Sequence, residues 1–324
     1  MKIAITELKN KIMSVLVNMP EADREITADY LIWSEMTGIK TQGIIKLAGK
    51  KPLQNIIPDS DIKIQRETKV SALMDAGKNL AIVASKKAAD IAIKKAKETG
   101  MSIVGVRNIF SSNGAQAYYV EQIAKHYLVG IMFSRCPSTV APFNSIDYLF
   151  GTNPVGFAFP TNDDPITFDA ATSAMTFYGV IMANSRGEQL PKDVAIDGMG
   201  NPTTDAAVVI DDGALLPFGN SHKAAGIGML VELMTGPLIG GAFLDTESAK
   251  EWGTTIIAID PNIFTDINEF KKNCSEFASQ IRNSRGRGNE QVRLPGDRAQ
   301  QAYKQAAVSG MVEIDDATYN QIFK

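Results

Sequence analysis

The chain has 324 residues, of which 44% are hydrophobic and 21% charged, and its formal net charge is −3. This size and composition suit a globular protein of two domains, and the slight acidity argues against a broad nucleic-acid-binding surface. No apolar run reaches the roughly 18 residues of a membrane span, and the first residues lack signal-peptide features. With two cysteines and two histidines, we expect a cytoplasmic protein without a zinc site.

Apolar spacing predicts helices over most of the first 50 residues, the second of them ending near Gly38. A strand at 70–74, an amphipathic helix at 79–99 and a strand at 102–106 form a β–α–β unit, which predicts a mixed or parallel sheet. Further helices are expected at 114–127, 172–182, 224–236, 266–282 and 298–308. Further strands are expected at 128–133, 155–159, 166–169 and 254–259. A short strand near Val312 and a helix from Asp316 close the chain and are expected to pack on the N-terminal helices.

Two glycine-containing segments have competing interpretations. The basic stretch 283–289 is the best candidate for a linker, either as a mobile surface loop or as a contact for a cofactor phosphate. No Gly-x-Gly-x-x-Gly follows a predicted strand, so a common Rossmann cofactor site is not expected. Gly226 and Gly228 lie within an apolar helical run, where small residues favour close packing.

A series of short motifs follows in order along the chain. It comprises Gly151-Thr152-Asn153-Pro154, Asp169-Ala170-Ala171-Thr172-Ser173, Leu190-Pro191, Pro202-Thr203-Thr204-Asp205, Gly213-Ala214-Leu215-Leu216-Pro217-Phe218-Gly219, His222-Lys223 with Val231-Glu232, and Leu294-Pro295-Gly296-Asp297. With this series the chain resembles the type-2 malate/L-lactate dehydrogenase family. That family also contains sulfolactate, ureidoglycolate and diketogulonate dehydrogenases and reductases of cyclic imino acids.

The resemblance implies an α/β protein that uses NADPH or NADH on a non-Rossmann scaffold. A mixed-sheet NAD(P)-binding domain is expected at 121–289, and a helical and β–α–β domain for substrate binding and dimerisation at 1–120 with 290–324. A homodimer with active sites at or near the subunit interface is also implied. The implied cofactor-binding residues are Thr152, Asn153, Asp169, Thr172, Ser173, His222, Lys223, Pro295, Gly296 and Asp297.

Several of these residues also have a purely structural interpretation. Thr172 and Ser173 could open a helix whose N–H groups hold a diphosphate, or they could form a plain helix cap. Lys223 could bind a phosphate or carboxylate, or point into solvent. His222 could face the cofactor or be a partly buried imidazole with its own partners. His126 is expected at a helix C-terminus, where the dipole favours it.

The chain departs from the family pattern on the substrate side. In the segment around Thr41, Gln42 stands where the family has its proton-donating histidine, and Lys46 stands where it has arginine. Ser111 or Ser112 takes the place of a second histidine. Arg135 stands where asparagine is common, and it could pair with a substrate carboxylate or be a surface charge. We therefore predict substrate-binding roles for Thr41, Lys46, Ser111, Ser112 and Arg135, and catalytic roles for Gln42, Asp169 and His222.

The loss of the histidine bears directly on the reaction. Reduction of a ketone needs a proton for the developing alkoxide, and a positioned acid contributes roughly 10²–10⁴ in rate. The amide of Gln42 cannot supply that proton, whereas a protonated imine does not need it. Our leading hypothesis is therefore reduction of a C=N bond in a small cyclic or 2-imino carboxylic acid. The alternatives are a 2-oxo acid dehydrogenase with a substitute proton donor, such as His222, Lys223 or water, and an inactive cofactor-binding homologue.

Overall fold

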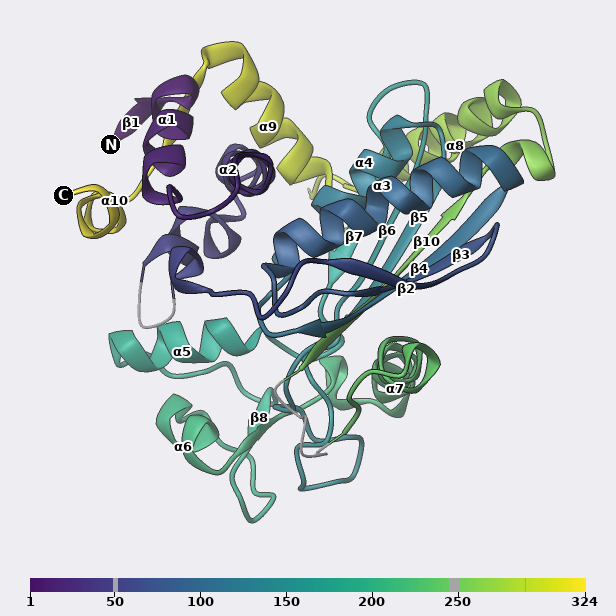
Figure 1. Ribbon diagram of the computed structural model, residues 1–324. Helices are drawn as coiled ribbons and strands as arrows, with labels where there is room; N and C mark the ends of the chain where they lie inside the picture. Colours follow the sequence, from purple (N-terminus) through teal and green to yellow (C-terminus); the bar gives the residue numbers. More distant parts are fainter. Residues whose placement is uncertain (49–51, 245–250, 289) are drawn as a thin grey trace.

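The computed structural model describes residues 1–48, 52–244, 251–288 and 290–324. Within these ranges a mixed sheet of seven strands, in the order β2-β3-β4-β10-β5-β6-β7, forms the centre of the molecule. Helices α3 and α4 lie on one face of this sheet and α7 on the other (Figure 1). The expected mixed α/β fold is thus confirmed. No helix in the described ranges is long and apolar enough to cross a membrane.

The strands are β1 Lys2–Ala4, β2 Lys63–Glu67, β3 Ser71–Asp75, β4 Met101–Ile109, β5 Val129–Arg135, β6 Val155–Phe159, β7 Ile166–Ala170, β8 Ala195–Ile196, β9 Ala214–Leu215, β10 Trp252–Ile259 and β11 Met311–Glu313. The α-helices are α1 Ile5–Val15, α2 Glu21–Met36, α3 Ala81–Thr99, α4 Ala117–Lys125, α5 Phe177–Arg186, α6 Ala206–Asp211, α7 His222–Thr235, α8 Ile267–Arg282, α9 Asp297–Ser309 and α10 Asp316–Phe323. The 3₁₀ turns are η1 Lys40–Gln42, η2 Ile44–Leu47, η3 Leu53–Asn55, η4 Phe218–Asn220, η5 Pro237–Ile239 and η6 Pro261–Ile263.

The predicted β–α–β unit is present, with β3 and β4 parallel and joined by α3. Helix α3 presents a buried row of small alanines, including Ala81, Ala88 and Ala92, which lets the helix lie close to the sheet. It ends at Gly100, whose φ of 87° is accessible to glycine at little cost.

Strand β10 joins the two halves of the sheet. It runs antiparallel to β4 on one side and to β5 on the other. Strands from both sides of the domain boundary expected near residue 120 therefore share one sheet. The division into two domains stays a prediction.

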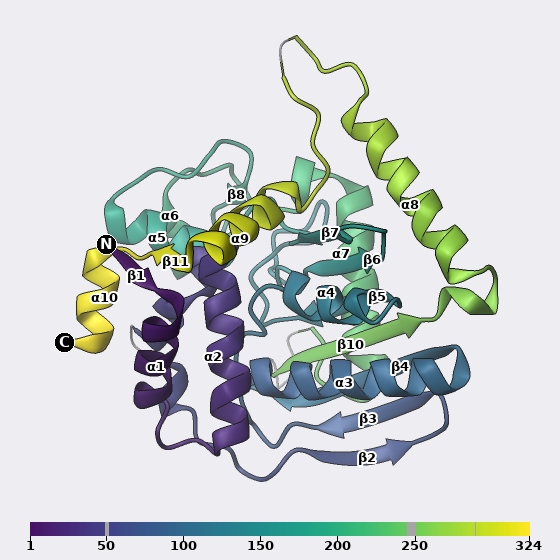
Figure 2. The same cartoon turned by 90° about the horizontal axis from the view of Figure 1, so that it is seen from above.

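The two ends of the chain pack together, as expected. Strand β1 pairs antiparallel with β11, with Ile3 opposite Val312. The ammonium of Lys11 on α1 lies 5.5 Å from the ring centroid of Tyr319 on α10. Figure 2 shows α1, α2, α9 and α10 grouped beside the sheet. It also shows that the basic segment after α8 projects from the body as the connection to α9; residue 289 of that segment lies outside the described residues.

One predicted helix begins later than expected. The sequence suggested a helix at 172–182, but α5 begins at Phe177, with the Thr176 side chain accepting a hydrogen bond from the Gly179 N–H. Thr172 is held by its backbone N–H to Thr152 O at 2.9 Å, and Ser173 forms an isolated β-bridge with Pro217. Their backbone is thus committed to extended pairing, so the proposal that Thr172 and Ser173 open a helix is wrong.

Candidate active site

The segment that carries Gln42 consists of two 3₁₀ turns held by a buried glutamate of α2. Glu35 Oε1 accepts a hydrogen bond from the Ile44 backbone N–H at 2.8 Å. A Cβ at Gly43 would lie 2.0 Å from that same oxygen, so only glycine permits this approach. Burial raises the pKa of the Glu35 carboxyl, although the hydrogen bond from Ile44 opposes the shift. This contact fixes the short stretch between Gln42 and Lys46.

Gln42 and Lys46 both carry polar groups that the described chain leaves without partners. The Oε1 atom of Gln42 is buried and accepts no hydrogen bond within the described residues. Burial lowers the pKa of the Lys46 ammonium to about 8, and Lys46 has no ion pair in the part of the chain described. Thr41 is exposed. An acceptor and a cation are thus available to a ligand at this segment.

The two serines at the predicted second histidine position already have backbone partners. Ser111 Oγ accepts from the Ala81 N–H at 2.9 Å and so caps α3, whose own preceding residue, Leu80, offers no cap. Ser112 Oγ accepts from the Gly114 N–H at 3.1 Å. Their roles in substrate binding stay predictions.

Asp169 lies at the N-terminus of α4. Its Oδ2 accepts from the Ala117 N–H at 3.1 Å, a placement that favours a carboxylate. Burial nevertheless raises the pKa of Asp169 to about 6, against the hydrogen bonds from the backbone of Ala117 and Gln116. Near neutral pH a fraction of this carboxyl therefore carries a proton.

Tyr30 lies on α2, the helix that contacts both the Gln42 segment and the loop before α4. Its hydroxyl accepts from the Ala115 N–H at 2.6 Å, and a Cβ at Gly114 would lie 1.8 Å from the hydroxyl oxygen. Burial is the main cause that raises the pKa of Tyr30, and the charge of Asp169 adds to it. Helix α2 thus contacts the loop before α4 through Tyr30 and the Gln42 segment through Glu35.

The predicted cofactor residues 152, 153, 172 and 173 lie together near α7. Thr152 O accepts from the N–H and the hydroxyl of Thr172, at 2.9 and 3.2 Å. Asn153 is fully buried and donates to Gly228 O and to Glu232 Oε1, at 3.2 and 2.8 Å. Ser173 Oγ donates to Met175 O at 2.6 Å. A Cβ at Gly228 would lie 3.2 Å from Thr172 Oγ1, which confirms close packing there, whereas Gly226 faces open space.

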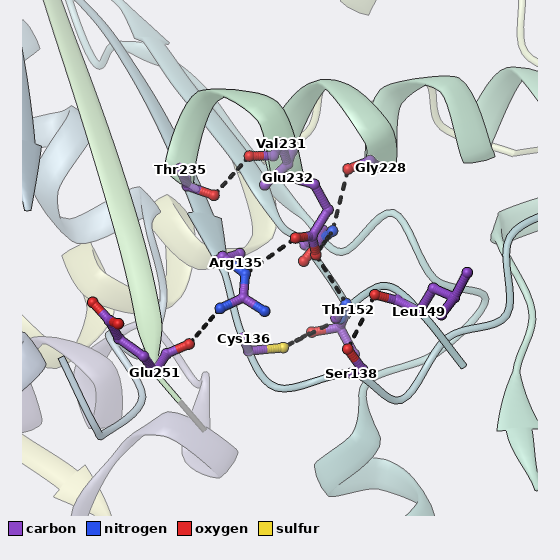
Figure 3. Close-up of polar contacts among 12 residues, drawn as sticks. Arg135, Cys136, Ser138, Leu149, Thr152, Gly228, Val231, Glu232, Thr235 and Glu251 are labelled. Carbon is purple, nitrogen blue, oxygen red and sulfur yellow. Dashed lines mark hydrogen bonds and ion pairs between the residues drawn. The ribbon is translucent and has the colours of Figure 1, made fainter. Parts of the chain in front are cut away.

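Arg135 corrects one interpretation of the sequence. The side chain is fully buried and its Nε lies 3.1 Å from Glu232 Oε2, so it is not a surface charge (Figure 3). Glu232 already supplies the carboxylate partner that a substrate was expected to provide.

The two histidines lie at helix ends. His222 begins α7, is exposed, and meets the Phe143 ring edge-on with centroids 5.9 Å apart. Lys223 follows it and is also exposed. His126 follows the last residue of α4, as expected, but burial and the neighbouring charge of Lys97 lower its pKa. No hydrogen bond within the described residues joins either histidine to Gln42.

The segment 294–297 precedes α9 and packs against β7. Gly296 has a φ of 87°, and a Cβ there would lie 2.7 Å from Thr167 O. Asp297 is paired with Arg282 through two hydrogen bonds of 3.1 and 2.7 Å, which lowers its pKa. A surface pocket of about 680 Å³ is lined here by Glu290, Gln291, Arg293, Leu294, Pro295, Gly296, Arg298 and Ala299.

These groups fit an anionic dinucleotide. Lys223 lies in the first turn of α7, where free N–H groups and the helix dipole favour phosphate. Arg293 and Arg298 line the pocket beside Gly296. None of these three cations forms an ion pair within the described ranges, so all are available to the phosphates of a cofactor.

Several residues of the site were not singled out from the sequence. Tyr30 and Glu35 lie on the buried face of α2, and Glu121 lies on α4, where burial raises its pKa to about 7. Asn113 is 2% exposed and donates to Ser85 Oγ and Thr254 Oγ1, both at 2.7 Å. Glu35 and Glu121 could have been noticed in the sequence, because each is a charged residue at a helical position where an apolar one is expected.

The described residues form a mixed sheet with no glycine-rich Rossmann turn, and cations lie at the starts of α7 and α9. The chain belongs to the malate/L-lactate dehydrogenase family, whose model matches residues 3–323. It is therefore an oxidoreductase, and dehydrogenases of this kind use nicotinamide cofactors.

Individual relatives differ in what they reduce or oxidise. The chain is 31% identical to an L-sulfolactate dehydrogenase of Methanothermobacter thermautotrophicus, over 94% of this chain and 90% of that one. It is also 31% identical to a Δ¹-pyrroline-2-carboxylate/Δ¹-piperideine-2-carboxylate reductase of Pseudomonas putida, over 75% and 72%. The crystal structure of malate dehydrogenase from Entamoeba histolytica matches with a TM-score of 0.92 at 26% identity, covering 99% of this chain and 96% of that one.

Proposed function

We propose that this protein reduces the C=N bond of a small cyclic or 2-imino carboxylic acid. The observation that carries the proposal is the buried Oε1 of Gln42, which accepts no hydrogen bond within the described residues. A protonated imine can donate its N–H to this oxygen, whereas a ketone oxygen would be bound by the Gln42 NH₂ group, which cannot supply the proton that the alkoxide needs. The substitution of histidine by glutamine thus suits a substrate that brings its own proton.

Lys46 and Asp169 complete the substrate side of the proposal. The Lys46 ammonium, with a pKa of about 8, is largely charged at neutral pH and would bind the substrate carboxylate. For a substrate that arrives as a neutral imine, the Asp169 carboxyl would supply the proton to nitrogen, since its pKa of about 6 keeps part of it protonated. His222 would belong to the cofactor side.

The cofactor would be NADPH in preference to NADH. Its extra 2′-phosphate would find Arg293 or Arg298 in the pocket beside Gly296, and its diphosphate would be held by Lys223 at the start of α7. When bound, it supplies the hydride for the reduction. Thr152, Asn153, Thr172, Ser173 and Asp297 would shape these two places through the hydrogen bonds described above, and Pro295 would line the second.

We also propose a homodimer. Helix α7 exposes a row of large apolar side chains, Ile227, Met229, Leu230 and Leu233, each at least 40% accessible. A helix that is apolar on its outer face needs a partner surface.

The second candidate is a 2-oxo acid reductase with a substitute proton donor. The raised pKa of Asp169 favours it, because a partly protonated carboxyl can protonate an alkoxide. The similarity to malate and sulfolactate dehydrogenases supports the same candidate.

A substrate panel tests the two candidates. The purified protein is given NADPH or NADH with Δ¹-pyrroline-2-carboxylate, Δ¹-piperideine-2-carboxylate and a series of 2-oxo acids, and cofactor oxidation is followed by absorbance. Turnover of the cyclic imines supports the first candidate, and turnover of 2-oxo acids alone rejects it. In the latter case an Asp169→Asn variant that loses kcat but still binds the cofactor, beside an active Gln42→Ala, would identify Asp169 as the substitute donor.

A further inference from the structure

A buried ion pair lies behind the loop at residues 151–153. Arg135 at the end of β5 is 0% exposed and Glu232 on α7 is 3% exposed. The Nε of Arg135 donates to Glu232 Oε2 at 3.1 Å, and its Nη1 donates to the backbone oxygen of Glu251 at 2.5 Å. Figure 3 shows the guanidinium between α7 and Glu251, the residue just before β10.

The other oxygen of Glu232 holds the loop. Glu232 Oε1 accepts from Asn153 Nδ2 at 2.8 Å and from the Gly151 N–H at 3.3 Å. Asn153 has a φ of 42°, in the left-handed region that asparagine adopts more readily than most other non-glycine residues. The hydrogen bond from its side chain to Glu232 holds it in this conformation.

The loop in turn holds the next predicted cofactor segment. Both donors of Thr172, its backbone N–H and its hydroxyl, bind Thr152 O. A shift of the 151–153 loop would therefore move Thr172 as well.

Arg135 supplies the positive charge next to the buried carboxylate of Glu232. A carboxylate buried without a cation is strongly disfavoured, and the remaining partners of Glu232 are neutral. The guanidinium pairs with Oε2 of Glu232, while Oε1 accepts from the loop. A neutral side chain in place of Arg135 could not supply this charge.

We propose that Arg135 is a positioning residue for cofactor binding: it holds Glu232 as a carboxylate, and Glu232 fixes the 151–153 loop in the shape that receives the cofactor. The second half of this inference rests on the proposed function, because it assumes that NADPH binds beside this loop. The first half concerns the chain alone.

The variants Arg135→Met, Glu232→Gln and the double variant Arg135→Met/Glu232→Gln separate positioning from general stability. Each is titrated with NADPH by fluorescence, after circular dichroism has shown that it is folded. We expect Arg135→Met to weaken NADPH binding about tenfold or more, because it leaves the buried carboxylate of Glu232 without its cation.

The double variant should recover most of the affinity, because a neutral amide still offers an acceptor to Asn153 and Gly151. Thr235→Val is the matched control: Thr235 is buried on the same helix and donates to Val231 O, away from the loop. We expect it to leave NADPH affinity unchanged.

Amide hydrogen exchange over 149–155 without cofactor provides the second readout. Exchange should be faster in Arg135→Met and near normal in the double variant. Unchanged exchange together with unchanged NADPH affinity in folded Arg135→Met would overturn the inference, as would a double variant no better than the single one. If exchange changes as expected but the wild-type protein binds neither NADPH nor NADH, the proposed function fails while the Arg135–Glu232–loop contact stands.

Discussion

The cofactor side and the substrate side of the site use their polar groups differently. On the cofactor side, the amide donor of Asn153, the hydroxyl of Thr172 and the carboxylate of Glu232 are hydrogen-bonded to one another or to the backbone, although the buried Asn153 Oδ1 has no partner in the described chain. On the substrate side, Gln42 Oε1 has no partner and Lys46 no ion pair in the described chain. The hydrogen bonds of the cofactor side fix its shape, whereas the polar groups of the substrate side are available to bind a ligand. Buried groups left unsatisfied are costly, so they point to what the site is built to bind.

The largest expected change comes from restoring the histidine. Gln42→His adds an imidazole that can protonate an alkoxide, so it should raise kcat/KM for a 2-oxo acid by roughly 10²–10⁴. Steady-state kinetics measures this, with Gln42→Asn as the control that keeps an amide and adds no acid. If the wild-type protein already reduces the 2-oxo acid as fast as Gln42→His, the inference that the substrate side lacks a proton donor for a ketone is wrong.

A smaller effect is expected in the pH dependence of substrate binding. The pKa of Lys46 is lowered to about 8 by burial, so the ammonium is present below that pH and lost as the pH rises through it. KM for a carboxylate substrate should therefore rise about tenfold per pH unit above about pH 8.

Lys46→Arg is the control for this profile, because a guanidinium stays charged throughout the range. The rise in KM should disappear in that variant. The same rise in both proteins would assign the titration to another group.

The smallest effect is expected at Ser111. Because its hydroxyl caps α3, Ser111→Ala should lower the free energy of unfolding by about 1 kcal/mol and leave KM nearly unchanged. Denaturant unfolding and kinetics measure the two quantities, with Ser112→Ala as the neighbouring control. A large rise in KM at unchanged stability would instead return Ser111 to substrate binding.

Much of the sheet and its helices could be predicted from local pattern. The alternation and apolar runs placed β6 at 155–159 and α3 close to its observed bounds. The start of α5 was missed because Thr172 and Ser173 are engaged by Thr152 and Pro217, partners distant in sequence. Short exposed elements such as β2 carry little hydrophobic signal, and the sequence did not indicate them.

The site was predictable as a set of motifs but not as a set of contacts. Gln42, Lys46 and Asp169 were chosen from residue type and order. Glu35 of α2 holds the Gln42 segment, and Tyr30 of the same helix holds the loop before α4. These contacts depend on which face of α2 is buried against which loop, and the sequence does not show this. For Arg135 the sequence left open a substrate carboxylate partner and a surface position, because a single charge in a sequence does not reveal its partner, Glu232, nearly a hundred residues away.

The position of β10 has a consequence for how the molecule is made. The strand that joins β4 to β5 leaves the ribosome long after both of its neighbours. Until it arrives, the strands β2–β4 and β5–β7 each lack their partner along one edge, and such open edges are prone to pair with other chains. Completion of the sheet is therefore a late, long-range step.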